Sequence, residues 1–186
     1  MIEFFNKPVV KYGNFFCFYL DQEILLQKLQ KLIDANVGKL DFQTNIQGQM
    51  TSWHHFKEEP LFKDLLNMLI PFYDRFKLEE WKEDTAMLSI RDAFASILKK
   101  DGFVEKHSHM GSCYSSALYF DDYADLHTDA GSFKTERGKV ITLPGWCNHW
   151  VDPIKQDVKR YTLVWNWNPV NEEIVERDKK DALKLQ

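Results

Sequence analysis

The chain has 186 residues, of which 44% are hydrophobic and 15% aromatic, values typical of one globular domain with its own core and not of a disordered segment. The formal net charge is −4 and the 24 Lys and Arg residues are scattered, which disfavours, without excluding, nucleic acid as a main partner. The three cysteines, Cys17, Cys113 and Cys147, lie far apart and form no CxxC pair, which argues against a disulfide framework or a thiolate zinc site and favours a reducing cytoplasm.

The sequence predicts no membrane segment. The N-terminal stretch lacks a basic region followed by a long apolar run, and no segment approaches the ~18 consecutive apolar residues of a membrane-spanning helix. We therefore expect a soluble protein with a single domain over residues 1–186. It divides into an N-terminal strand with supporting helices (1–84), a β core (85–170) and a charged tail (171–186).

The N-terminal part contains a predicted strand and two predicted helices. The aromatic run from Asn14 to Leu20 indicates the strand, after which Asp21 provides a helix cap and Gly38 a stop. A second helix is expected to begin near Pro60, since proline is favoured at the first helical position, and to kink at Pro71. The apolar residues recur at three- and four-residue spacing: Leu25, Leu29, Leu32 and Ile33 in the first helix, and Phe62, Leu65, Leu66, Leu69, Phe72, Tyr73 and Phe76 in the second. Because these faces need a broad hydrophobic partner, we expect both helices to pack on the outside of a sheet.

From Thr85 onward the apolar period changes to two, which indicates β-strands. The predicted strands are Met87 to Leu98, Phe103 to His109, Tyr114 to Phe120, Lys139 to Leu143 and Tyr161 to Trp167. Turn residues separate them, as at Pro144-Gly145. The sequence therefore predicts a mainly β protein with some α, built on a mostly antiparallel sheet folded over into a sandwich or barrel. The tail is expected to be a surface helix or partly disordered.

Two histidines, His107 and His109, lie two positions apart on a predicted strand. Because successive side chains of a strand point to opposite faces, both imidazoles share one face and converge on one point. His149 follows the Pro144-Gly145 turn, which can fold a later strand back over the first. Three imidazoles suit a divalent iron, zinc, copper or nickel ion and leave coordination positions open for a co-substrate and oxygen. The sequence therefore predicts a metal site at these three histidines.

A second histidine pattern competes for this role. His127-Thr128-Asp129 has the HxD spacing of a site with two histidines and one carboxylate, but His127 is only 22 positions from His149, too few for the strands that must intervene. His107 precedes His149 by 42 positions, enough for about four strands. We favour the first pattern and keep Asp129 as a candidate acidic ligand. The neighbours His54 and His55 are expected to be surface or packing residues.

A predicted anion clamp follows the third histidine by 11 positions. One face of this strand carries Arg160, Thr162, Val164 and Asn166, and the other carries Tyr161, Leu163, Trp165 and Trp167. An arginine that faces a barrel interior is costly unless it is paired, and no acid lies on the same face. A bound dicarboxylate would satisfy it through a bidentate bond from Arg160 and one bond from the Thr162 hydroxyl. The alternative is a surface ion pair with Asp152 or Asp157.

Together these residues resemble the 2-oxoglutarate and iron(II)-dependent oxygenase superfamily, and in particular a branch found in bacteria and marine phages. The strong likeness covers Asp92 to Asn168, and Trp53 with the second helix matches weakly. It is carried by Gly102-Phe103, His107-Ser108-His109, Ser115 to Phe120, Pro144-Gly145 and Arg160-Tyr161-Thr162. The usual second metal ligand of the family is an acid, whereas this chain has His109. An alternative is that His109 only lines the pocket while two histidines and water hold the ion.

The resemblance implies a double-stranded β-helix, a jelly-roll or cupin-like barrel, flanked by the N-terminal helices, in the cytoplasm of a bacterial or phage-infected cell. It also implies Fe(II) at the three histidines and 2-oxoglutarate docked by Arg160 and Thr162. Decarboxylation of 2-oxoglutarate to succinate would then be coupled to oxidation of a substrate. Tyr114, Tyr119 and Asn166 are further candidates to bond 2-oxoglutarate or to orient a ligand, because of their predicted positions on barrel strands.

Two other functions compete with this hypothesis. One is a cupin-like metal-dependent enzyme that does not use 2-oxoglutarate, and the other is a non-catalytic jelly-roll binding protein whose histidines are incidental. Binding of 2-oxoglutarate through Arg160 would argue against the first alternative. Stabilisation by a divalent metal would argue against the second. The sequence leaves open the substrate and the oligomeric state, a homodimer included.

Overall fold

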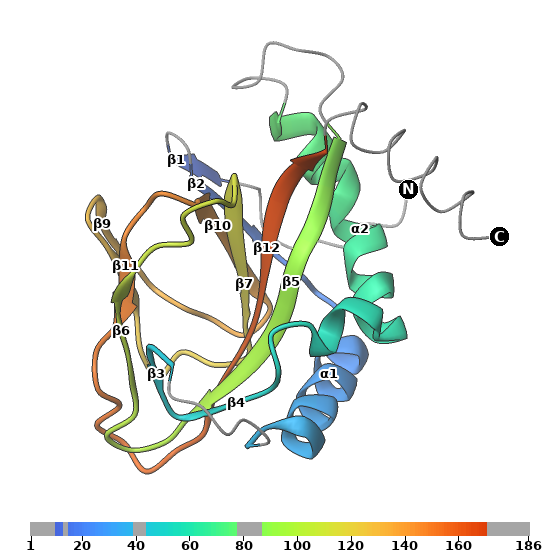
Figure 1. Ribbon diagram of the computed structural model, residues 1–186. Coiled ribbons are helices and arrows are strands. Elements are labelled where there is room, and N and C mark those ends of the chain that lie inside the picture. Colours follow the sequence, from blue (N-terminus) through green and yellow to red (C-terminus); the bar gives the residue numbers. More distant parts are fainter. Residues whose placement is uncertain (1–9, 13–14, 39–43, 78–86, 171–186) are drawn as a thin grey trace, which may run out of the picture.

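The computed structural model describes residues 10–12, 15–38, 44–77 and 87–170. In this part of the chain two β-sheets lie face to face, and two helices cover the outer face of the larger sheet (Figure 1). In order across it, the larger sheet contains β1 (Val10–Tyr12), β2 (Phe15–Tyr19), β10 (Lys139–Pro144), β7 (Tyr114–Tyr119), β12 (Arg160–Val170), β5 (Met87–Leu98) and β4 (Gln49–Met50). The smaller sheet contains β3 (Ile46–Gln47), β6 (Phe103–His107), β11 (His149–Val151), β8 (Leu126–Thr128) and β9 (Gly131–Phe133).

Strands β5 to β12 wind back and forth between the two sheets. The strands β5, β7, β10 and β12 belong to the larger sheet and β6, β8, β9 and β11 to the smaller, so the chain changes sheet after every one or two strands. The pairings between them are antiparallel. This arrangement is a double-stranded β-helix, and it confirms the predicted fold class.

The two helices follow the predicted pattern closely. Helix α2 (Pro60–Lys77) begins at Pro60, where the fixed φ of proline suits the first turn, and it continues through Pro71. Helix α1 (Glu23–Asn36) starts two residues after Asp21; its N-cap is Gln22, which makes no side-chain cap bond, so the predicted Asp21 cap is wrong. A short 3₁₀ turn, η1 (His55–Glu58), precedes α2.

Alternation along the strands of the larger sheet separates two hydrophobic cores. Outward side chains such as Phe18, Leu163 and Trp165 meet the helices, where Leu29 and Ile33 of α1 are fully buried. Inward side chains form the second core, between the sheets: Phe15, Cys17, Leu98, Tyr119, Leu126, Ile141, Leu143, Cys147, Val151 and Ile154. The amphipathic helices are therefore scaffold for the larger sheet, as their spacing predicts.

The sequence pattern missed the shortest strands. β8, β9 and β11 have three residues each and β3 and β4 two each, too short to show a period of two. The predicted helical or disordered tail, residues 171–186, lies outside the described residues. Among the helices that the structure describes, none is long and apolar enough to cross a membrane.

A buried hydroxyl network ties α2 to the larger sheet. The Tyr73 hydroxyl lies 2.7 Å from Ser116 Oγ and 2.8 Å from Thr142 Oγ1, and these two oxygens lie 2.8 Å apart. Trp167 Nε1 also donates to Ser116 Oγ at 3.0 Å. Burial raises the pKa of Tyr73 to about 12, so its phenol keeps its proton.

Replacing Tyr73 by Phe should lower the free energy of unfolding by about 1 kcal/mol, because Ser116 and Thr142 lose one partner each but keep each other. Urea denaturation measures this difference. The matched control is Tyr123→Phe, since Tyr123 is 42% exposed. Equal stability of the two variants would show that the network contributes nothing.

An exposed ion pair joins α1 to the β core. Arg137 donates from Nε and Nη2 to the two carboxylate oxygens of Glu23, at 2.9 and 2.8 Å, and from Nη1 to the Phe120 carbonyl at 3.0 Å. The hydrogen bonds from Arg137 lower the pKa of Glu23 from 4.5 to about 2. The pair links the first turn of α1 to the connection between β9 and β10, and the bond to Phe120 extends this link to the segment that follows β7.

The contribution of this pair should depend on pH. The pKa of Glu23 is lower in the folded state, so the stabilisation is fully present above about pH 4.5 and is lost as the pH falls towards 2. Glu23→Gln should therefore lower the free energy of unfolding by less than about 1 kcal/mol at pH 7, because the pair is exposed. Urea midpoints over this pH range should converge for the two proteins near pH 2. A constant gap would contradict the ionic origin.

Candidate metal centre

Two of the predicted ligands lie side by side on adjacent strands of the smaller sheet. β6 ends at His107 and β11 begins at His149, and the two residues are direct partners in the register of these strands. Their ring centroids lie 4.3 Å apart. The fold thus brings together two imidazoles that are 42 positions apart in the sequence.

The third imidazole comes from the connection between β6 and β7. His109 lies two residues beyond the end of β6, so the strand predicted up to His109 is wrong at its end. The backbone holds it in place, because His109 N–H donates to the Gly145 carbonyl at 2.8 Å and Gly145 N–H donates to the Cys113 carbonyl at 2.9 Å. A Cβ atom on Gly145 would overlap the Ser112 carbonyl oxygen, so this close crossing of two connections requires glycine. The His109 ring lies 5.0 Å from each of the other two rings.

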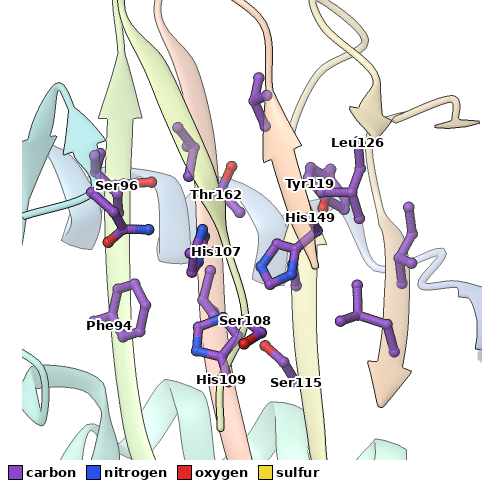
Figure 2. A pocket seen from close by; sticks show the side chains of 18 of the residues that line it. Phe94, Ser96, His107, Ser108, His109, Ser115, Tyr119, Leu126, His149 and Thr162 are labelled. Carbon is purple, nitrogen blue, oxygen red and sulfur yellow. The ribbon is translucent and has the colours of Figure 1, made fainter. Parts of the chain in front are cut away.

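The three rings surround one common space (Figure 2). One ring nitrogen from each lies within 4.8 Å of the other two. Bonds of about 2.1 Å to one ion would hold the ligand nitrogens about 3 to 3.5 Å apart. Small rotations of the side chains would shorten the present distances between the nitrogens to these values. The geometry therefore suits a divalent metal ion.

Backbone carbonyls select the tautomer of two of these rings. His107 Nδ1 lies 2.7 Å from the Glu105 carbonyl and His149 Nδ1 lies 3.0 Å from the Cys147 carbonyl. A carbonyl only accepts, so both Nδ1 atoms carry the proton and both Nε2 atoms present a lone pair. Burial lowers the pKa of His109 to about 3 and that of His149 to about 4, and it also lowers the pKa of His107. All three imidazoles are neutral at pH 7, the form that binds metals.

The three further candidates from the strands divide between the two faces. Asn166 lies beside the three histidines, with its amide nitrogen 3.2 Å from His109 Nδ1, and Tyr119 lines the cavity onto which the histidines open. Tyr114 lies on the opposite face, where its ring packs 5.8 Å from that of Phe16. Tyr114 and Tyr119 are five positions apart on β7, an odd separation that places them on different faces, so Tyr114 does not reach the site.

Arg160 lies at another wall of this cavity and is 2% exposed. Its Nη1 donates to Thr162 Oγ1 at 3.0 Å, and its guanidinium carbon lies 5.1 Å from the centre of the Tyr119 ring. Within the described residues, Nε and Nη2 of this buried side chain have no hydrogen-bond partner. The surface ion pair considered as the alternative for Arg160 is therefore wrong. Two unsatisfied N–H donors on a buried cation create a site for an anion.

The histidines and the guanidinium share one cavity of about 320 Å³ between the two sheets. Apart from the polar groups at its two ends, its walls are largely apolar, with Val104, Leu126, Ile141, Leu143 and Val164 among them. Such a volume holds a small dicarboxylate and part of a substrate.

The other histidines lie elsewhere. His127 points outwards from β8, because Leu126 next to it faces the cavity; its Nδ1 lies 2.7 Å from Ser132 Oγ and its Nε2 3.4 Å from Asp152. Asp129 accepts 2.8 Å from Asn148 Nδ2 and pairs with Lys106, away from the three rings. His55 packs its ring 5.2 Å from that of Phe56. The HxD alternative is therefore disfavoured, and so is Asp129 as a ligand.

No known protein family and no curated protein matches this sequence. Solved structures do match. A viral collagen prolyl hydroxylase from Paramecium Bursaria Chlorella virus-1 matches with a TM-score of 0.63 at 12% identity, over 89% of this chain and 95% of that one. A prolyl-4-hydroxylase from Pseudomonas putida gives 0.59 at 14%, over 81% and 89%. HygX from Streptomyces hygroscopicus, with nickel and 2-oxoglutarate bound, gives 0.62 at 11%, over 84% and 83%. This likeness shows that the chain has the fold of 2-oxoglutarate-dependent oxygenases.

Sequence reasoning missed several residues around the cavity. Phe94 and Trp53 form one wall, with ring centroids 4.7 Å apart, and Asp92 lies buried next to Asn166. The available signal for Asp92 was an acid at an inward position of a long apolar strand. Trp53 precedes η1, where no periodic pattern marks its direction.

Adding Mn(II) or Ni(II) should raise the melting temperature, because an ion that binds only the folded state stabilises it by mass action. Replacing His107, His109 or His149 by Ala should each abolish the gain. His127→Ala, which removes an imidazole outside the cluster, should leave it unchanged. Differential scanning fluorimetry measures this, and an equal gain in all four variants would place the metal elsewhere.

Proposed function

We propose that this protein is a 2-oxoglutarate and Fe(II)-dependent oxygenase that hydroxylates a substrate yet to be identified. The observation that supports this most directly is the buried Arg160, whose Nε and Nη2 have no partner among the described residues and which shares a cavity with three neutral imidazoles. A metal centre alone fits many enzymes. A metal centre facing an unsatisfied guanidinium fits a co-substrate that has a carboxylate at one end and a chelating group at the other.

The residues present fit both implied groups. His107 and His149 each present an Nε2 lone pair, and His109 completes the set, so these three would hold the ion. Bound Fe(II) would supply the redox chemistry that couples decarboxylation of 2-oxoglutarate by oxygen to oxidation of a substrate C–H bond. HygX, which has the same fold, binds nickel and 2-oxoglutarate, in agreement with this pairing.

Arg160 and Thr162 would dock the far carboxylate of 2-oxoglutarate. The Thr162 hydroxyl oxygen already accepts from Arg160, so its own proton is free to donate to the same carboxylate. The Tyr119 phenol, whose pKa burial raises to about 12, stays neutral and keeps its ring against the guanidinium. The apolar walls would reduce the contact of a bound co-substrate with bulk water.

We further propose that the protein works in a reducing compartment such as the cytoplasm. The cysteines are free thiols in the structure, and burial raises the pKa of Cys17 and of Cys113 to about 11. Thiols in this state are unreactive and form no disulfide framework.

The function is tested by incubating the protein with Fe(II), ascorbate, oxygen and 2-oxoglutarate and measuring succinate by mass spectrometry. Succinate above the level of a His149→Ala control supports the proposal. If the wild-type protein forms no succinate and does not bind 2-oxoglutarate, the metal-dependent enzyme without a keto acid becomes the better explanation.

Replacing Arg160 by Met should weaken the binding of 2-oxoglutarate without lowering the stability of the fold. Loss of two charge-assisted bonds should weaken 2-oxoglutarate binding by about 100-fold, measured by calorimetry with Mn(II) in place of Fe(II). The ligand-free variant should melt at or above the wild-type temperature, because an unsatisfied buried cation is removed. Arg137→Gln, which removes an exposed guanidinium, should bind 2-oxoglutarate normally. Unchanged affinity in Arg160→Met would contradict the clamp.

A further inference from the structure

A buried chain of polar groups extends outwards from the metal centre. His109 Nδ1 lies 3.2 Å from the amide nitrogen of Asn166, and the same nitrogen lies 2.5 Å from the Asp92 carboxyl oxygen Oδ1. Asn166 and Asp92 are direct partners across β12 and β5. They are 3% and 9% exposed, so both side chains are removed from water.

The proposed metal and co-substrate contacts do not by themselves account for this row of hydrogen-bonded side chains. His107 and His149 are each oriented by a backbone carbonyl, whereas His109 is oriented by the Asn166 side chain. A side-chain amide rotates freely unless a second partner holds it. Asp92 is that partner, because its carboxyl is the other group in hydrogen-bond contact with the Asn166 amide nitrogen.

We propose that Asp92 is a positioning residue for the metal centre, which fixes the Asn166 amide and through it the ring of His109. The inference rests on the proposed function, since it concerns one of the three proposed ligands. Asp92 touches no ligand and no substrate itself. Its role is to hold the one imidazole that comes from a connection and not from a strand.

His109 needs a different partner atom from Asn166 when it binds a metal through Nε2. Its Nδ1 then carries the proton and needs an acceptor, and the amide oxygen of Asn166, which is buried and has no partner among the described residues, becomes that acceptor when the amide turns over. The turned amide oxygen then also faces Asp92, which serves it best as a protonated carboxyl that donates. Burial raises the pKa of the Asp92 carboxyl above its ordinary value, in the direction of that form.

The exposed neighbour Arg91 does not account for Asp92. Its Nε lies 3.6 Å from the second carboxyl oxygen, Oδ2, and its side chain is 46% exposed. A pair at this distance with an exposed partner contributes little. The shorter and buried contact is the one to Asn166.

The experiment measures Co(II) affinity by titration, with the cobalt absorption bands as a readout of ligand geometry and melting temperature as a check on folding. Asp92→Ala should weaken Co(II) binding by about 10-fold or more and shift the bands, in the range found for residues that orient metal ligands. Asp92→Asn should restore near wild-type affinity, since its amide can hydrogen-bond Asn166 at the same place. The matched control is Asp121→Ala, which removes a part-buried carboxyl that accepts from the Tyr161 backbone N–H at 2.8 Å.

A double-mutant cycle tests whether Asp92 acts through Asn166. Asn166→Ala should weaken Co(II) binding at least as much as Asp92→Ala, and the double variant should be no worse than Asn166→Ala alone. Additive losses, wild-type affinity in Asp92→Ala, or failure of Asp92→Asn to restore binding would each overturn the role. If Asp92→Ala does not fold, wild-type affinity in Asn166→Ala overturns it equally. Absence of Co(II) binding in the wild-type protein, or binding that survives His149→Ala, would overturn the proposed metal centre together with this inference.

Discussion

The two-residue period of β12 is the constraint on which the fold and the site both depend. This strand lies between β7 and β5 in the larger sheet, and its outward side chains, Tyr161, Leu163, Trp165 and Trp167, are buried in the core formed with the helices. Its inward side chains are Arg160, Thr162, Val164 and Asn166, which face the cavity or the metal centre. A slip of one residue would bury the guanidinium against the helices and expose indoles to the cavity. The packing of the helices therefore selects the register that builds the site.

Long elements were predictable because their patterns repeat many times. β5 and the start of α2 match the expected boundaries, and the alternation on β12 matches as well, since eleven or more residues average out local exceptions. The three-residue strands β8, β9 and β11 were not predictable, because three residues are too few to show a period of two, and β11 pairs with β6, which lies far away in the sequence. Tyr114 shows a different limit. Its strand was predicted correctly, but strand parity places its ring on the face opposite to that of Tyr119.

The choice between the two histidine patterns shows what spacing alone can decide. His127 and His149 belong to adjacent strands, β8 and β11, so the short stretch of sequence between them does not exclude a shared site, contrary to the expectation from spacing. What disfavours His127 is direction: Leu126 and Thr128 occupy the inward and buried positions of β8, and His127 between them stacks on Trp150 outside. The position of His109 carries the opposite lesson, because a glycine crossing and an amide, not strand parity, turn its ring towards the other two.

The cavity also explains why so many polar groups are left incompletely bonded inside one small barrel. Arg160 Nε and Nη2 and the Asn166 amide oxygen are buried without partners among the described residues, and each such group lowers stability by about 1 to 3 kcal/mol. Random burial of this kind would be selected against. Of the five buried side-chain atoms without a partner among the described residues, two lie on the proposed carboxylate clamp and one beside His109, whereas His55 Nε2 and Trp165 Nε1 lie away from the cavity. The ligand-free protein is therefore less stable than its packing allows, and binding of an anion at Arg160 would return part of that stability to the folded state.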